Sequence, residues 1–289
     1  MTVQPDRGPV ALRILLGGQL RRLRESRGIS REAAGYEIRG SESKISRLEL
    51  GRVGFKERDI EDLLTFYGII DEAGRAPMLA LAREANQPGW WHRFADILPD
   101  WFESYLGLET AATLIRTYEV QFIPGLLQTE DYARSVIIQS NAPGTVSAKD
   151  IERRVDMRMS RQKVLDRPNP PRLWAVLDEA ALRRPIGTPA VMRTQLERLI
   201  AVSERPNLAI QVMPFAFGGH VAESGAFSVL RFAEPNLPDI IYLEHLTGAV
   251  YLDKVADVSR YAEAMNRLSV DSLPPDKSAE RLARIIAET

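Results

Sequence analysis

The chain has 289 residues, of which 45% are hydrophobic, and this is enough apolar material to build a core in each of two domains. It contains no cysteine, which excludes disulfide bonds and thiolate metal sites. The formal net charge is −1, no apolar run approaches the roughly 18 residues of a membrane-spanning helix, and the first residues lack a signal-peptide pattern, so we expect a soluble, cytoplasmic protein.

Charge is distributed unevenly along the chain. Residues 1–56 contain 12 Lys and Arg against 6 Asp and Glu, a net charge of +6, and the remainder carries −7. A basic head on an acidic body is typical of a modular nucleic-acid binder, because counterion release then drives only the head onto DNA.

The first part of the chain predicts a flexible tail over residues 1–11 and then a compact all-α domain over residues 12–70. Its first helix is indicated over 12–23, where leucines recur at three- and four-residue steps. A later helix over 60–67 is expected to end at Gly68, since glycine is the usual residue just after a helix.

Residues 30–51, in the middle of this domain, predict two short helices joined by a tight turn. Ser30 and Ser41 are suitable N-cap residues, because their hydroxyls accept hydrogen bonds from the free amides of a first helical turn. Gly35 and Gly40 supply the small side chain and the permissive backbone that a close helix crossing and a sharp turn need.

The second helix of this pair has a thin apolar seam, formed by Ile45 and Leu48 at helical spacing. Its remaining face is polar and consists of Glu42, Ser43, Ser46 and Arg47. Such a helix suits the major groove of DNA better than a protein core. The alternative is a pair of helices that only packs, or that binds another protein.

The stretch from Leu16 to Ile69 resembles the lambda-repressor-like, or XRE-type, helix-turn-helix domain, and the string SKISRLELGR at 43–52 is similar to that family's signature. The resemblance implies contacts with double-stranded operator DNA through the start of the second helix of the domain, which is the first of the pair, through the exposed face of the recognition helix and through two phosphate-binding cations. The residues that it assigns to these roles are Arg31; Ser41, Glu42, Ser43, Ser46 and Arg47; and Lys44 and Arg52.

Two positions depart from the pattern of that family. Arg31 stands where glutamine is usual, which we expect to change the sequence preference. Arg39 stands where the turn glycine is usual, with Gly40 one position later, and this leaves the geometry of the turn open.

A helix over 72–86 is expected to connect the head to the remainder of the chain, so we assign 71–89 to a linker and 90–289 to a second domain. The predicted strands of this domain are 115–123, 173–177, 208–213, 227–232 and 240–246, with a short one at Tyr251, and the predicted helices are 129–138, 148–165, 189–203, 255–268 and 277–287. We therefore expect a multidomain protein: an all-α head and an α+β body with a mainly antiparallel sheet.

Four motifs of the body, PGLLQTEDYAR (124–134), RLWAVLDEAALRRPIG (172–187), IQVMPF (210–215) and YLEHLTGAVYLD (242–253), resemble the companion domain of a large actinobacterial, WhiJ-like regulator family. The resemblance implies an antitoxin-like DNA-binding regulator, often encoded beside a small partner protein.

No constellation in the body indicates an enzyme. His92, His220 and His245 lie far apart, and neither a metal-binding spacing, a nucleophile elbow nor a phosphate loop is present. We expect no catalytic residue, no metal and no cofactor. The arginines of the helix at 148–165 are mixed with acidic residues, and we expect a solvated face there.

The loop between Phe215 and Phe227 is the candidate partner or ligand surface of the body, through Phe215, Phe217 and His220. It contains three glycines, so it is either a mobile contact surface or an ordinary long hairpin connection. We expect a homodimeric, sequence-specific transcription regulator whose input is a small protein, or alternatively a small molecule held in the body.

Overall fold

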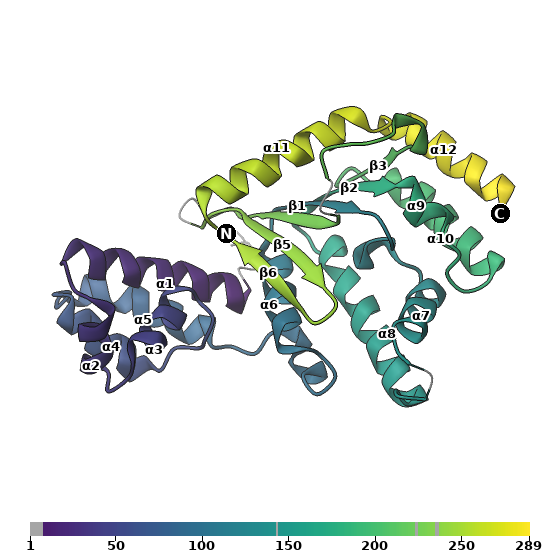
Figure 1. Cartoon of the computed structure of the whole chain (residues 1–289). Helices are drawn as coiled ribbons and strands as arrows, with labels where there is room; N and C mark the ends of the chain where they lie inside the picture. Colours follow the sequence, from purple (N-terminus) through teal and green to yellow (C-terminus); the bar gives the residue numbers. More distant parts are fainter. Residues whose placement is uncertain (1–7, 143, 223–224, 235–236) are drawn as a thin grey trace. The chain divides into compact units, whose positions relative to one another are not determined.

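The computed structural model describes residues 8–142, 144–222, 225–234 and 237–289, and it divides into two compact units (Figure 1). The head holds the described residues up to Arg93, together with 103–111 and the described residues of 233–237. The body holds 94–102 and the rest of the described chain. The predicted tail falls mostly outside the described residues, although residues 9–11, which we assigned to it, form the first turn of a helix.

Five helices build most of the head, and a 3-10 turn (η1, Trp90–Phe94) follows them. The helices are α1 (Pro9–Ser26), α2 (Arg31–Glu37), α3 (Glu42–Glu49), α4 (Glu57–Phe66) and α5 (Glu72–Ala85). Each matches a helix that the periodicity of the sequence predicts. The first is longer than expected at both ends, because Pro9 is compatible with a first helical turn and Gly28 lies two residues beyond its end.

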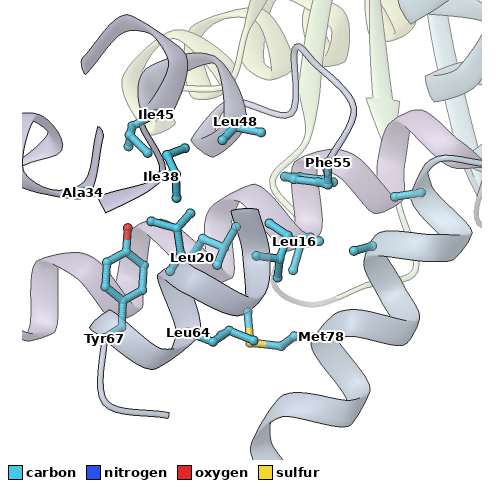
Figure 2. Close-up of a cluster of buried hydrophobic side chains, with 14 of the residues drawn as sticks. Leu16, Leu20, Ala34, Ile38, Ile45, Leu48, Phe55, Leu64, Tyr67 and Met78 are labelled. Carbon is cyan, nitrogen blue, oxygen red and sulfur yellow. The ribbon is translucent and has the colours of Figure 1, made fainter. Parts of the chain in front are cut away.

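The core of the head gathers apolar side chains from all five helices (Figure 2). Leu16 and Leu20 of α1 lie at its centre and are almost fully buried. Ile45 and Leu48, the seam predicted for α3, are buried in the same cluster. Burying a leucine or isoleucine side chain stabilises a fold by about 1.5–3 kcal/mol, so this seam holds α3 firmly to the domain.

Helix α5, which we expected to connect the head to the body, packs inside the head. Met78, Ala82 and Ala85 belong to the core cluster of the head. Just beyond the helix, the side chain of Asn86 accepts a hydrogen bond from the amide of Phe55 at 2.9 Å and donates one to its carbonyl. The end of α5 is therefore tied to the loop that precedes α4.

The body is built on a sheet of six strands in the order β3-β2-β1-β4-β5-β6. These strands are β1 (Leu114–Glu119), β2 (Arg172–Asp178), β3 (Leu208–Met213), β4 (Phe227–Arg231), β5 (Ile240–His245) and β6 (Gly248–Leu252). The predicted strands match them, but β1 is shorter than expected because the chain turns away before Pro124.

The sheet is mixed, which corrects the expected mainly antiparallel arrangement. The pairs β1–β2 and β2–β3 are parallel, whereas β1–β4, β4–β5 and β5–β6 are antiparallel. Parallel neighbours need long crossover connections, and the chain supplies helices between β1 and β2 and again between β2 and β3. The later strands have shorter connections and pair as antiparallel neighbours.

Helices and short turns of the body lie around this sheet (Figure 1). They are η2 (Gly125–Leu127), α7 (Glu130–Gln139), α8 (Ala148–Gln162), η3 (Lys163–Asp166), α9 (Glu179–Arg183), α10 (Pro189–Ser203), η4 (Phe215–Phe217), α11 (Val255–Asp271) and α12 (Pro275–Glu288). Helix α6 (Asp100–Ala111) begins in the body, and its residues 103–111 belong to the head. Among the described residues, no helix is both long and apolar enough to span a bilayer.

The two faces of the sheet differ in chemistry. On one face, Tyr118, Val176 and Phe227 form an apolar core with Met265 and Leu268 of α11. The opposite face is apolar beneath β2 and β3, where Ala175, Leu177 and Ile210 are buried. Beneath β1, β4 and β5 it carries a buried apolar row of Ile115, Leu230 and Ile240 and, beside it, a buried polar row of Thr117, Ser228 and Tyr242.

Candidate nucleic-acid interface

The local structure of α2 and α3 follows from their two capping serines. Ser30 accepts a hydrogen bond from the amide of Ala33 at 3.1 Å, and Ser41 accepts one from the amide of Lys44 at 3.2 Å. Both serines therefore occupy the N-cap positions that the sequence predicts. The second cap fixes the residue at which α3 begins, and so fixes which side chains occupy its first turn.

Two glycines let neighbouring backbones approach α3 closely. A Cβ added at Gly35 of α2 would lie 2.9 Å from the carbonyl carbon of Ser41, so a larger residue would push the two helices apart. A Cβ added at Gly17 of α1 would lie 2.4 Å from the carbonyl oxygen of Leu48, at the other end of α3. The helix is thus clamped at both ends by contacts that only glycine permits.

Arg39 takes the backbone conformation of the glycine that the family pattern has at its position. Its φ is +51°, and among the described residues it is the only non-glycine residue with positive φ. The amide of Gly40 donates to the carbonyl of Gly35 at 2.8 Å, and the amide of Arg39 donates to that of Tyr36 at 3.1 Å, which is the Schellman pattern. The turn is therefore a regular helix C-cap, and Gly40 is not the residue in the left-handed region.

Helix α3 presents a polar surface at its start and along one side. Ser41, Glu42, Ser43 and Arg47 are exposed, and Ser46 is partly exposed. These five residues are those that the resemblance assigns to base edges. Since the opposite side of α3 is buried in the core of the head, this polar face is the only one that the helix can offer to a partner.

A buried carboxylate joins three helices behind that surface. The side chain of Glu49, at the end of α3, is 3% exposed and accepts a hydrogen bond from Arg24 Nη2 of α1 at 3.1 Å. Arg31 Nε, at the start of α2, donates to the same carboxylate at 3.1 Å. The hydrogen bond to Glu49 is the main cause that raises the pKa of Arg24 above its ordinary value.

Ion pairs within the head change how two predicted DNA contacts are placed. Arg31 is about one-third exposed, and its Nε faces Glu49, so part of its guanidinium is committed to the protein. Lys44 Nζ lies 2.6 Å from Asp59 Oδ2 of α4, with the Lys44 side chain 28% exposed. Arg52, at the end of the α3 turn, is exposed. Their DNA contacts stay predictions.

The structure separates the three residues of the candidate surface in the body. Phe215 and Phe217 are 57% and 43% exposed, but the His220 side chain is only 15% exposed. His220 Nε2 lies 2.9 Å from the hydroxyl of Tyr118, which donates to Asp178 at 3.1 Å. His220 therefore anchors its loop to the sheet and does not belong to the exposed pair. Residues 223–224 of this loop lie outside the described residues.

Two exposed residues beside α3 were not predicted as contacts from the sequence. Arg39 presents an exposed cation directly before α3. Tyr36 of α2 is 86% exposed, an unusual position for a large aromatic side chain. The departure from the family pattern at position 39 could have identified Arg39 from the sequence. Helix α2 is too short to give a clear periodicity, so the exposure of Tyr36 could not be predicted in this way.

Comparison with known protein families agrees with this geometry. The model of a helix-turn-helix domain matches residues 15–78, so the head is a helix-turn-helix domain of the kind found in DNA-binding regulators. The model described as a domain of unknown function, DUF5753, matches residues 102–284. That match covers more than half of the chain, and the chain belongs to this family. No curated protein and no solved structure matches it. The WhiJ-like resemblance within this family stays a prediction.

Proposed function

We propose that this protein is a sequence-specific transcription regulator that inserts α3 into the major groove of operator DNA. The observation that carries the proposal is the clamped position of α3 in a matched helix-turn-helix domain, with its polar face outward. A helix held at both ends keeps its side chains in register with base edges, and such preorganisation is what direct readout requires.

Within this proposal, Arg47 and Ser46 read base edges together with the first turn of α3. Arg47 is exposed and long enough to donate to guanine O6 and N7, the commonest specific contact in the major groove. Glu42 accepts a hydrogen bond from the N4 amino group of cytosine, or repels bases that present an acceptor at that position. Ser41 and Ser43 hydrogen-bond to bases or to the adjoining phosphates.

The phosphate contacts come from cations around α3. We assign Arg52 and Lys44 to this role, with Arg31 at the start of α2, and we add Arg39 because its exposed side chain stands directly before the recognition helix. On binding DNA, the Lys44 ammonium would either leave Asp59 for a phosphate or form ion pairs with both groups. The logarithm of the binding constant falls linearly with the logarithm of the salt concentration, and each phosphate contact makes this slope more negative by about 0.9.

The protein is proposed to act as a homodimer in the cytoplasm, since one such head contacts too few bases and phosphates for tight specific binding and two-fold dimers read palindromic operators. The body then supplies the dimer surface and receives the signal. Its input is a small protein encoded nearby, as the WhiJ-like resemblance implies. The alternative input is a small molecule bound in the body.

The test is binding of the purified protein to its own upstream DNA across a salt titration. Arg47→Ala should cost roughly 1–3 kcal/mol and relax the preference at one base pair, whereas Arg52→Ala should weaken all sequences alike. Arg198→Ala is the matched control, because Arg198 is an exposed arginine of α10 in the body. Salt-independent or sequence-independent binding of the unaltered protein would refute the proposal.

A further inference from the structure

A groove lies between α11 and the first two strands of the sheet, on the face that α11 covers (Figure 1). Its volume is about 390 Å³, which falls within the range of roughly 300–1,000 Å³ that small-molecule sites have. The lining is mostly apolar and is formed by Leu114 of β1, Trp174 of β2 and Val270 of α11. The polar members of the lining are Arg116 of β1, Arg172 of β2, and Asn266 and Ser269 of α11. We call these residues the α11 groove.

The register of the sheet explains why the strand residues of the α11 groove meet. Arg116 lies opposite Trp174 across the parallel pair β1–β2, and Leu114 lies opposite Arg172, so the four side chains share one face. Tyr118, two residues after Arg116 on that face, belongs to the apolar core that α11 completes. The α11 groove therefore continues this core toward the start of β1 and β2, where the side chains become partly exposed.

The guanidinium of Arg116 is held in place by neutral groups. Its Nη1 donates to Asn266 Oδ1 at 2.7 Å, and its Nη2 donates to Ser269 Oγ at 3.2 Å. Its central carbon lies 5.1 Å from the ring centroid of Trp174, which is within the range of a cation–π interaction. These contacts orient the cation and leave its charge without a negative counterpart.

The aromatic wall of the α11 groove is also fixed. The indole Nε1 of Trp174 donates to Gln211 Oε1 at 2.7 Å. The amide nitrogen of Gln211 donates in turn to the carbonyls of Ser269 and Leu273, at 3.0 Å each. A wall that is ordered before a ligand arrives lowers the entropy that binding costs.

The two arginines of the α11 groove have no acidic partner. Within the part of the chain that the structure describes, neither Arg116 nor Arg172 forms an ion pair, and no residue that lines the groove is acidic. Arg231 lies opposite Leu114 on β4, but it pairs with Asp239 at 2.8 Å. Burial lowers the pKa of Arg116, and the positive charge of Arg231 acts in the same direction. A partly desolvated cation without a counter-charge is costly, so an anion in the groove would be bound favourably.

We infer that the α11 groove binds a small carboxylate with an apolar body, of the aromatic or medium-chain aliphatic kind. The carboxylate lies against Arg116 and Arg172, because a guanidinium presents a planar fork of donors that matches two carboxylate oxygens. The apolar body covers Leu114, Trp174 and Val270. The inference goes beyond DNA recognition, since every residue of the groove belongs to the body and binding requires no operator.

The first test is calorimetric titration of the full-length protein with benzoate, phenylacetate and hexanoate, beside their uncharged amides and inorganic phosphate. At least one of the carboxylates should bind with a millimolar or tighter Kd. Its amide has the same shape but no charge, and phosphate has the charge but no apolar body. Each of these two should therefore bind at least about tenfold more weakly.

Two exposed valines of α11 offer a matched pair of charge substitutions. Val270 lines the groove and is 83% exposed, whereas Val255, at the other end of the helix and outside the lining, is 80% exposed. Val270→Glu should weaken carboxylate binding by at least about tenfold, because the new carboxylate repels the ligand and competes for the arginines. Val255→Glu should leave binding unchanged. Both side chains face solvent, so neither substitution should disturb the fold.

The arginines allow a second comparison. Arg172→Gln should weaken binding of the carboxylate by about tenfold and leave binding of its amide unchanged, because the lost contact is a charge-assisted hydrogen bond. Arg198→Gln is the control, since Arg198 is an exposed arginine of α10. Arg116→Gln should abolish the difference between the carboxylate and its amide.

The second test reports on the position of the ligand. Isotope-labelled tryptophan gives one indole signal in nuclear magnetic resonance for each of the four tryptophans, and Trp174→Phe identifies the signal of Trp174. The bound carboxylate should shift this signal and leave those of Trp90, Trp91 and Trp101 in place. Failure of all three carboxylates to bind, equal binding of the amide, or a Trp174 signal that does not move would overturn the inference. Operator binding measured on the same sample reports on the head separately.

Discussion

Arg24 and Glu49 are 25 positions apart in the sequence and form a buried ion pair that joins the end of α1 to the end of α3. Both side chains are less than 10% exposed. The pair lies directly behind the proposed recognition surface, and it carries Arg31 of α2 as a third member. The position of α3 therefore depends on charge as well as on its apolar seam.

Replacing Glu49 should test this dependence. Glu49→Gln leaves the guanidinium of Arg24 buried without its counter-charge, and breaking a buried pair in this way typically costs about 3–5 kcal/mol. We expect a loss of this order in the free energy of unfolding, measured by urea denaturation. Glu280→Gln is the control, since within the described chain Glu280 pairs only with Lys277, both side chains are exposed, and the substitution should change little. Equal losses in the free energy of unfolding for the two variants would show that the buried pair stabilises the head no more than a surface pair does.

The glycines at positions 17 and 18 of α1 offer a matched pair of alanine substitutions. Gly17→Ala places a Cβ 2.4 Å from the carbonyl oxygen of Leu48, so α1 and α3 must separate, and we expect a loss of about 2 kcal/mol or more in stability together with weaker DNA binding. Gly18→Ala meets only the side chain of Arg22, at 3.6 Å, and should stabilise α1 by up to about 1 kcal/mol. Thermal unfolding distinguishes the two outcomes, and a neutral Gly17→Ala would mean that the helices do not cross so closely.

Arg39 should show opposite effects on stability and on DNA binding. Arg39→Gly relieves a left-handed backbone at a C-cap and should stabilise the head by about 0.5–1 kcal/mol. It also removes a proposed phosphate contact, so the slope of log K against log salt concentration should become less steep by about 0.9, the value for one contact. Arg39→Ala removes the same contact but keeps the strain. If both variants bind DNA as the unaltered protein does, Arg39 contacts no phosphate.

Glu119 should make the stability of the protein fall as the pH rises from the ordinary carboxyl range to about 7. Burial raises its pKa in the folded protein to about 7, so between the ordinary carboxyl range and neutrality the folded state binds more protons than the unfolded state. Stability from this group is therefore present at acid pH and is lost as the pH rises through 7. Denaturation at several pH values should show a shallower decline for Glu119→Gln, which stays neutral throughout. Parallel curves for the two proteins would contradict the placement of Glu119 in a desolvated site.

Local features of the fold were accessible from the sequence because their causes lie within a few residues. Ser30 and Ser41 cap the helices that they were expected to cap, and α10 spans Pro189–Ser203 as predicted, because Thr188 caps it and Pro189 fits its first turn. The direction of strand pairing is a property of distant segments. Even so, helices predicted between β1, β2 and β3 are themselves an indication of parallel crossovers, which the expected antiparallel sheet did not include.

The sites were less accessible than the fold. The exposed residues of α3 followed from its periodicity, whereas the pairing of Arg24 with Glu49 has no local signature. The buried polar row of Thr117, Ser228 and Tyr242 was missed for the same reason, since its members come from three separate strands. Within α8, the mixture of arginines with acidic residues predicted a solvated face, but Arg158 is only partly exposed and donates a hydrogen bond to Gln128.

The hydrogen bonds between Asn86 and Phe55 show that the helix-turn-helix core extends beyond the range matched by its family model. The family match to the helix-turn-helix stops at residue 78, but Ala82 and Ala85 complete the core, and Asn86 satisfies both backbone groups of Phe55. A fragment that stops at residue 70 or 78 would leave Leu16 and its neighbours open to water and would expose unpaired amides in the loop. An isolated head suited to nuclear magnetic resonance or to DNA crystallisation therefore has to run past Asn86.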